Sequence, residues 1–198
     1  MWPILIEPGT DADAANDMAP HIPVTVGQSG KTVNKIVRAD ISDAAEILAL
    51  QRLAYQSEAV IYGDWSIPPL TQTLEELKKE FEEMTFLKVC DSGRLIGSVR
   101  ASIREGTCEI GRLIVHPEFQ HKGVGTGLMS AIEAEFPSVA RFELFTGSRS
   151  KGNIRLCERL GYRVFRTDRL SPQVELVFME KVRMQLPDHA PAARRLLP

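Results

Sequence analysis

The 198-residue chain has few cysteines, no long apolar run and almost no excess charge. Three cysteines, Cys90, Cys108 and Cys157, are too few and too odd in number for a disulfide framework, and their spacing fits no zinc pattern. The formal net charge of −2 gives no reason to expect nucleic acid or an anionic membrane as a partner. Residues 1–6 are apolar, but this run is too short for a membrane span and lacks the basic start of a signal peptide. The few cysteines favour a reducing compartment, so we expect a cytoplasmic protein.

The remaining composition is that of a small globular protein. Hydrophobic residues make up 43% of the chain and charged residues 25%, and the length allows one domain with a sizeable core. Residues 1–32 lack helical or strand periodicity and are predicted to be a loose leader, and residues 184–198 are predicted to be a tail. The folded domain is therefore expected over residues 33–183.

Hydrophobic periodicity and turn residues predict the order β-α-α-β-β-β-α-β-α-β-β around one mixed sheet, an α+β arrangement. Ser42 is expected to open the first helix, and Thr73 the second, with Glu76 completing a capping box. Pro68 and Pro69 lie between these two helices and are expected to stop any helix there. The expected strands are 33–38, 85–90, 95–103, 108–115, 141–146, 162–167 and 174–181, and the later helices are 124–136 and 153–160.

A glycine-rich turn joins a predicted strand to a predicted helix. Gly123, Gly125 and Gly127 stand at alternate positions there, so the backbone is bare where the helix begins. A helix N-terminus has unpaired N–H groups and a partial positive charge, and therefore attracts anions. Gln120 and Lys122 add a donor and a cation to the same turn. The segment predicts a phosphate-binding site.

The spacing of this turn distinguishes among phosphate-binding families. It matches neither the Rossmann G-x-G-x-x-G pattern nor the Walker pattern. It resembles the acetyl-coenzyme A signature of the GNAT N-acetyltransferases, V-x-P-x-x-[QR]-x-x-G-x-[GA], whose fixed positions are Val115, Pro117, Gln120, Gly123 and Gly125. The predicted element order is also that of the GNAT fold, which implies a three-layer α/β/α structure with one central, mostly antiparallel sheet.

The resemblance implies that acetyl-CoA is the co-substrate. The backbone of residues 113–115 would line its acetyl and pantetheine arm and supply an N–H to the reacting oxygen. The residues that the resemblance assigns to coenzyme binding are Leu113, Ile114, Val115, Gln120, His121, Lys122, Gly123, Val124, Gly125, Thr126 and Asn153. No metal is implied, and no metal-ligand spacing appears among the four histidines.

A second resemblance, over residues 150–162, is to the late GNAT motif N-x-x-[AN]-x-x-L-Y-E-[KR]-L-G-[FY]. Its matching positions are Asn153, Leu156, Glu158, Arg159, Leu160, Gly161 and Tyr162. The tyrosine that often returns a proton to the coenzyme thiolate in this family is replaced by Cys157. We expect Cys157 to be a small packing residue, with a proton-donating role as the alternative. Asn153 either contacts the pantetheine or simply caps its helix.

The acceptor side and the base are less defined. Tyr55, Glu58 and Tyr62 recur at three- and four-residue spacing, which places them on one helix face. This region usually forms the acceptor side of the GNAT cleft, and aromatics with a carboxylate would suit an amine with an apolar body; alternatively, the tyrosines are core-edge residues and Glu58 is solvated. An attacking ammonium must first lose a proton, so a carboxylate base is expected, either Glu109 or Glu143, directly or through water.

Taken together, the sequence predicts an N-acetyltransferase that acts by direct attack in a ternary complex. The acceptor is expected to be a small-molecule amine or a peptide amine; polyamines, amino acids, drugs and protein N-termini or lysines all stay open, as does a homodimer. A non-catalytic acyl-CoA-binding or sensing protein on the same fold is the alternative, supported by the missing tyrosine, and a longer acyl donor is not excluded. Release of free thiol with amines would separate an enzyme from a sensor.

Overall fold

One mixed sheet organises the part of the chain that the computed structural model describes, residues 35–183. Within these residues seven strands lie in the order β1-β2-β3-β4-β5-β7-β6, and every pairing is antiparallel except that of β4 with β5. The strands are β1 (Ile36–Arg38), β2 (Thr85–Asp91), β3 (Arg94–Arg104), β4 (Thr107–Val115), β5 (Arg141–Gly147), β6 (Arg163–Arg169) and β7 (Glu175–Val182). The predicted leader and tail lie outside the described residues.

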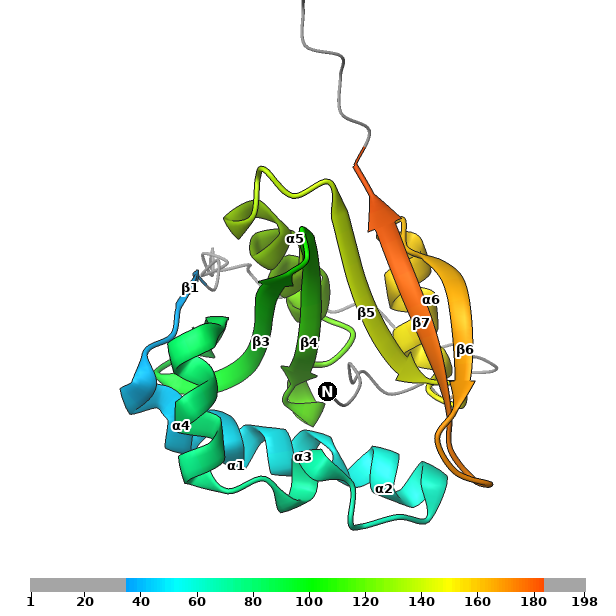
Figure 1. The fold of residues 1–198 in the computed structure, drawn as a ribbon. Coiled ribbons are helices and arrows are strands. Elements are labelled where there is room, and N and C mark those ends of the chain that lie inside the picture. The colour runs from blue at the N-terminus through cyan, green and yellow to red at the C-terminus, as the bar shows by residue number, and fades with distance from the viewer. Residues whose placement is uncertain (1–34, 184–198) are drawn as a thin grey trace, which may run out of the picture.

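Helices cover both faces of this sheet. The helices are α1 (Ala44–Ala54), α2 (Gln56–Tyr62), α3 (Pro68–Thr71), α4 (Leu74–Glu83), α5 (Val124–Glu135) and α6 (Lys151–Arg159). Helices α1–α4 gather on one side of the sheet, and α5 and α6 lie behind it (Figure 1). Two separate apolar clusters result, one between the sheet and α5–α6 and one under α1–α4. The three-layer α/β/α arrangement and the mostly antiparallel mixed sheet are confirmed.

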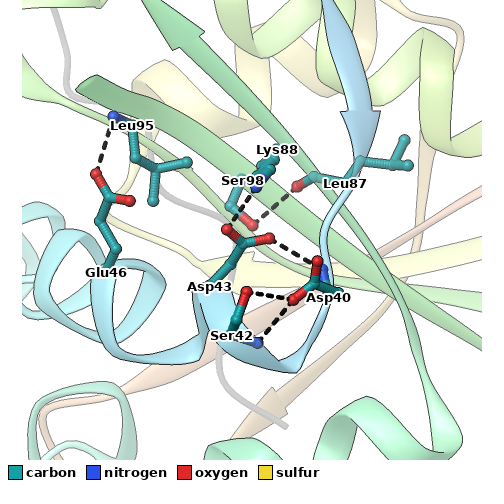
Figure 2. Close-up of polar contacts among 8 residues, drawn as sticks. All are labelled: Asp40, Ser42, Asp43, Glu46, Leu87, Lys88, Leu95 and Ser98. Atoms are coloured by element: carbon teal, nitrogen blue, oxygen red, sulfur yellow. Dashed lines mark hydrogen bonds and ion pairs between the residues drawn. The ribbon is translucent and has the colours of Figure 1, made fainter. Parts of the chain in front are cut away.

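The first helix is anchored by a network of carboxylates (Figure 2). Asp40 accepts hydrogen bonds from the backbone N–H and the hydroxyl of Ser42, and Asp43 accepts from the N–H of Asp40. This capping box begins a short 3-10 turn, Ile41–Asp43, that leads into α1. The expectation that Ser42 opens the helix is therefore wrong, because the acceptor at the cap is the side chain of Asp40.

The same network ties α1 to the sheet. Lys88 on β2 forms an ion pair with Asp43, and Glu46 on α1 accepts a hydrogen bond from the N–H of Leu95 at 3.1 Å (Figure 2). Both contacts join the N-terminal half of the helix layer to adjacent strands. They fix the N-terminal end of α1, opposite to the end from which α2 continues.

The segment after α2 differs from the prediction. Pro68 and Pro69 were expected to stop any helix, but α3 begins at Pro68. Proline is tolerated in a first helical turn because the missing N–H has no partner there in any helix. Thr73 and Glu76 form the predicted capping box of α4.

The strands β4 and β5 separate soon after they meet. Their parallel pairing covers Thr107–Arg141, Cys108–Phe142 and Glu109–Glu143, and no further ladder pair joins these two described strands. Beyond that point they diverge (Figure 1). The edge of β4 that faces β5 therefore offers backbone groups to a ligand over its second half.

A bulge in β4 lies at the start of this gap. The pairing with β3 moves from Arg100–Gly111 to Ser98–Ile114, so two residues of β4, Arg112 and Leu113, lie opposite the single residue Val99 of β3. Arg112 lies within the bulge and has a φ of 49°, in the left-handed region. A bulge leaves one residue out of the ladder and increases the local twist, so it turns β4 away from β5.

Helix α2 packs closely on β5 where Tyr62 meets Gly147, and a substitution of Gly147 tests this packing. A β-carbon at position 147 would lie 2.7 Å from Tyr62 Cζ and 2.8 Å from Cε2. We expect Gly147→Ala to lower the free energy of unfolding by about 1–3 kcal/mol in urea titrations. Gly127→Ala is the control, because its β-carbon meets only the end of Ile36 at 3.3 Å; equal losses for the two variants would contradict the tight packing.

Candidate active site

The start of α5 opens onto a cavity of about 270 Å³. Gly123 precedes the helix with a φ of 83°, and no side chain caps it. The N–H groups of its first turn therefore keep their partial positive charge for a ligand. The cavity is lined by His121, Gly123, Gly125, Thr126, Leu156 and Arg159. No carboxylate contributes to this lining, and the arrangement suits an anion such as a pyrophosphate.

Arg159 is the residue of this cavity to which the sequence assigned no role. It matched the late motif, but its position in the last turn of α6 lies far along the chain from the glycine turn. The fold brings α6 close enough to the start of α5 for Arg159 to line the same cavity. The sequence shows the positive charge of Arg159, but only the fold shows that this charge lies near the start of α5.

The other residues of the turn shape the loop. Gln120 Nε2 donates to the carbonyl of Val115 at 3.4 Å, and Lys122 Nζ lies 5.0 Å from the centre of the Phe119 ring. Val124 packs against the core. Neither Gln120 nor Lys122 lines the cavity in this structure. Their predicted contact with a ligand stays a prediction.

Residues 113–115 lie on β4 just after the bulge. Leu113 and Val115 pack into the cluster under α5–α6, and Ile114 packs into the opposite cluster. Because the side chains are buried on both faces, what this segment offers to the gap is its backbone. The expected use of this backbone in binding the coenzyme stays a prediction.

The predicted acceptor residues are all buried. Tyr55 is fully buried, Glu58 is 3% exposed and Tyr62 is 7% exposed. The alternative that Glu58 is solvated is therefore wrong. Ser150 donates its hydroxyl proton to Glu58 Oε1 at 2.6 Å, and the N–H of Arg149 donates to Tyr62 Oη at 2.9 Å. We call these two hydrogen bonds, with the Tyr62–Gly147 contact, the α2 clamp.

Asn153 lies in the first turn of α6, just after Arg149 and Ser150, which bind α2. It is fully buried, and its Nδ2 donates to Thr146 Oγ1 at 3.4 Å. The N-cap position of α6 is Ser150, so Asn153 is not the capping residue. Its contact with the pantetheine remains a prediction.

The two candidate bases lie together where β4 and β5 last pair. Glu109 and Glu143 are register partners, and both line a cavity of about 340 Å³ with Arg104, Leu144, Phe145, Arg166 and Phe178. Glu143 pairs with Arg141 at 2.6 Å. Among the described residues Glu109 has no ion pair. Of the two carboxylates, Glu109 is thus the one that no ion pair holds in the described part of the chain.

Cys157 is fully buried in the cluster between the sheet and α6. Burial raises the pKa of its thiol to about 12. The thiol is therefore neutral at physiological pH, as expected of a packing residue.

Within residues 35–183, no group of three or more His, Cys, Asp or Glu side chains could hold a metal ion. None of the helices in that range has the length and hydrophobicity of a membrane span.

Several solved structures share this arrangement. The PaiA N-acetyltransferase of Thermoplasma acidophilum, in complex with coenzyme A, has a TM-score of 0.65 at 20% identity, covering 75% of this chain and 98% of its own. YncA of Salmonella typhimurium, with acetyl-CoA, has a TM-score of 0.62 at 21% identity, covering 80% and 100%. The ribosomal-protein-alanine N-acetyltransferase of Brucella melitensis has a TM-score of 0.60 at 18% identity, covering 75% and 99%. At these identities the similarity shows the fold.

The sequence comparison gives the family. The model of the acetyltransferase (GNAT) family matches residues 45–162, and the chain belongs to this family. The UPF0157 protein YqkA of Bacillus subtilis is 29% identical over 119 residues, which are 60% of this chain and 34% of that protein. The chain thus spans about a third of the length of this relative.

Burial of the thiols predicts their reactivity. Cys108 and Cys157 are buried with pKa values raised to about 12, whereas Cys90 is partly exposed. We expect a thiol-alkylating reagent at pH 8 to modify Cys90 first in the native protein, and the other two only after unfolding. Mass spectrometry of peptides would report the sites. Rapid modification of native Cys157 would show instead that its sulfur is open to the cleft.

Proposed function

We propose that the protein is an N-acetyltransferase that moves the acetyl group of acetyl-CoA to a primary amine by direct attack in a ternary complex. The observation that carries the proposal is the gap between β4 and β5, which exposes backbone next to the anion-binding start of α5. Membership of the GNAT family, and neighbours solved with coenzyme A and acetyl-CoA, support the same donor here.

The donor would be held mainly by backbone. The first turn of α5 and Arg159 suit the pyrophosphate, and the free edge of residues 113–115 suits the amides of the pantetheine arm. The bulge at Arg112 turns the following peptide out of the ladder. The N–H of Leu113 is then the donor for the negative charge that develops on the thioester oxygen.

Removal of the amine proton is assigned to the carboxylate pair at the closed end of the gap. Glu109 precedes Leu113 by four residues, about 13 Å along an extended strand. That span exceeds the reach of a side chain, so a water relay from Glu109, with Glu143 as the second candidate, fits better than direct contact. Because Cys157 is buried and neutral, the leaving thiolate would take its proton from solvent.

The donor site is tested at Gly125, which is buried in the wall of the anion cavity. We expect Gly125→Asp to abolish coenzyme A binding in calorimetry, because the carboxylate would occupy and repel the pyrophosphate position. Ser130→Asp is the control, since it adds the same charge to an exposed position of the same helix. Unchanged affinity in a folded Gly125→Asp protein would refute the site.

The base is tested by thiol release with acetyl-CoA and a panel of amines. Glu109→Gln removes the proton acceptor, and we expect kcat at neutral pH to fall by about 10²–10⁴ with coenzyme binding retained. Glu82→Gln, at an exposed position on α4, is the control. A severe loss only in Glu143→Gln would move the role to that residue. Binding without thiol release from any amine would favour the non-catalytic alternative.

A further inference from the structure

Two arginines are buried beneath the helix layer formed by α1–α4. Arg100 on β3 is 3% exposed, and Arg112 in the bulge of β4 is 6% exposed. Arg100 forms an ion pair with Glu80 of α4. Arg112 has no ion pair among the described residues, and its Nε and Nη1 atoms are buried without a hydrogen-bond partner. Arg112 is thus a buried cation without a carboxylate.

The side chain that Arg112 contacts does not neutralise its charge. Its guanidinium lies over the ring of Tyr55, with Cζ 5.5 Å from the ring centre, and burial raises the pKa of that phenol to about 12, so it stays uncharged. Burial and the charge of Arg112 together lower the pKa of Arg100 to about 9. Two buried cations therefore lie close together on this face of the sheet. Burying a guanidinium that has no charged partner costs the folded protein free energy. We therefore interpret Arg112 as a residue that binds a ligand rather than one that stabilises the fold.

Arg112 forms part of the wall of a cavity of about 430 Å³, whose lining is Pro68, Thr71, Gln72, Glu76, Glu80, Arg100 and Arg112. Both carboxylates of this wall already have partners, since Glu80 pairs with Arg100 and Glu76 caps α4 by accepting from Thr73. The cavity lies on the acceptor side of the sheet, and Arg112 directly precedes Leu113. The cavity and the proposed donor site therefore flank the same stretch of β4.

We propose that Arg112 binds a carboxylate of the acceptor, so that the substrate is a primary amine carrying a carboxylate, as in amino acids. This assignment rests on the proposed function. The planar carboxylate matches the fork of a guanidinium, which can bind it through two parallel hydrogen bonds. A dianionic phosphate fits less well, because Glu76 and Glu80 also face the cavity.

The substrate class is tested with matched acceptors in the thiol-release assay. α-, β- and γ-amino acids would each be compared with the corresponding carboxamide. We expect the wild-type kcat/KM to favour the acids, and Arg112→Gln to lower kcat/KM for them by about 10–100-fold while activity on the carboxamides is retained. Arg112→Lys should keep part of the preference, because it keeps the charge and loses the fork. Arg163→Gln, at an exposed position on the edge strand β6, is the control.

A second readout does not need turnover. Replacing an unpaired buried charge with a side chain of similar volume should raise the melting temperature of the ligand-free protein, so we expect Arg112→Met to be more stable than wild type. Added 4-aminobutanoate should raise the melting temperature of wild type and leave that of Arg112→Met unchanged.

The outcomes separate the two proposals. Acetylation of amines without a preference for acids, or a preference that survives in Arg112→Gln, would overturn the carboxylate site and leave the transferase proposal standing. A clear loss of stability in Arg112→Met would show that the guanidinium is structural and would also overturn it. If no amine releases thiol, the transferase proposal fails, and the Arg112-dependent stabilisation by 4-aminobutanoate alone decides whether carboxylates bind there.

Discussion

The parallel pairing of β4 with β5 lasts for three residues, and the proposed site depends on its ending there. Strand β5 continues in a full antiparallel ladder with β7, whereas β4 is bent by the bulge at Arg112 and stays with β3. Backbone groups that a continuous sheet would pair internally are left for a ligand. The same bulge displaces a guanidinium into the opposite layer, so one irregularity shapes both the donor side and the acceptor side.

Positive and negative groups lie at opposite ends of the gap between β4 and β5. The uncapped start of α5 and Arg159 make one end positive through backbone and side chain together. Glu109 and Glu143 gather at the closed end, where Arg141 already holds one of them. Between these ends the side chains of residues 113–115 are buried and uncharged. An anionic donor and a protonated amine would thus be drawn to different parts of one opening.

Much of this arrangement could be predicted from local sequence. The strands, the capping box at Thr73 and the glycine turn are specified by residues that are neighbours in the chain, and the family follows from that turn. The cap at Asp40 and the short helix at Pro68 were missed because several local solutions compete there. The burial of Glu58 and the isolation of Arg112 depend on which distant element packs over them. No window of sequence contains that information.

The α2 clamp constrains how this protein can diverge. Glu58 and Tyr62 are buried, and their side chains hold the loop that leads into α6. A substitution there would disturb α2 and the start of α6 at once. Helix α3 is held differently, since Gln51 Nε2 donates to the backbone carbonyl of Pro69, an acceptor that any residue would supply. Residues of α3 can therefore be exchanged with less disturbance of the fold than residues of α2, and if this layer binds the acceptor as proposed, new specificities would arise more readily in α3.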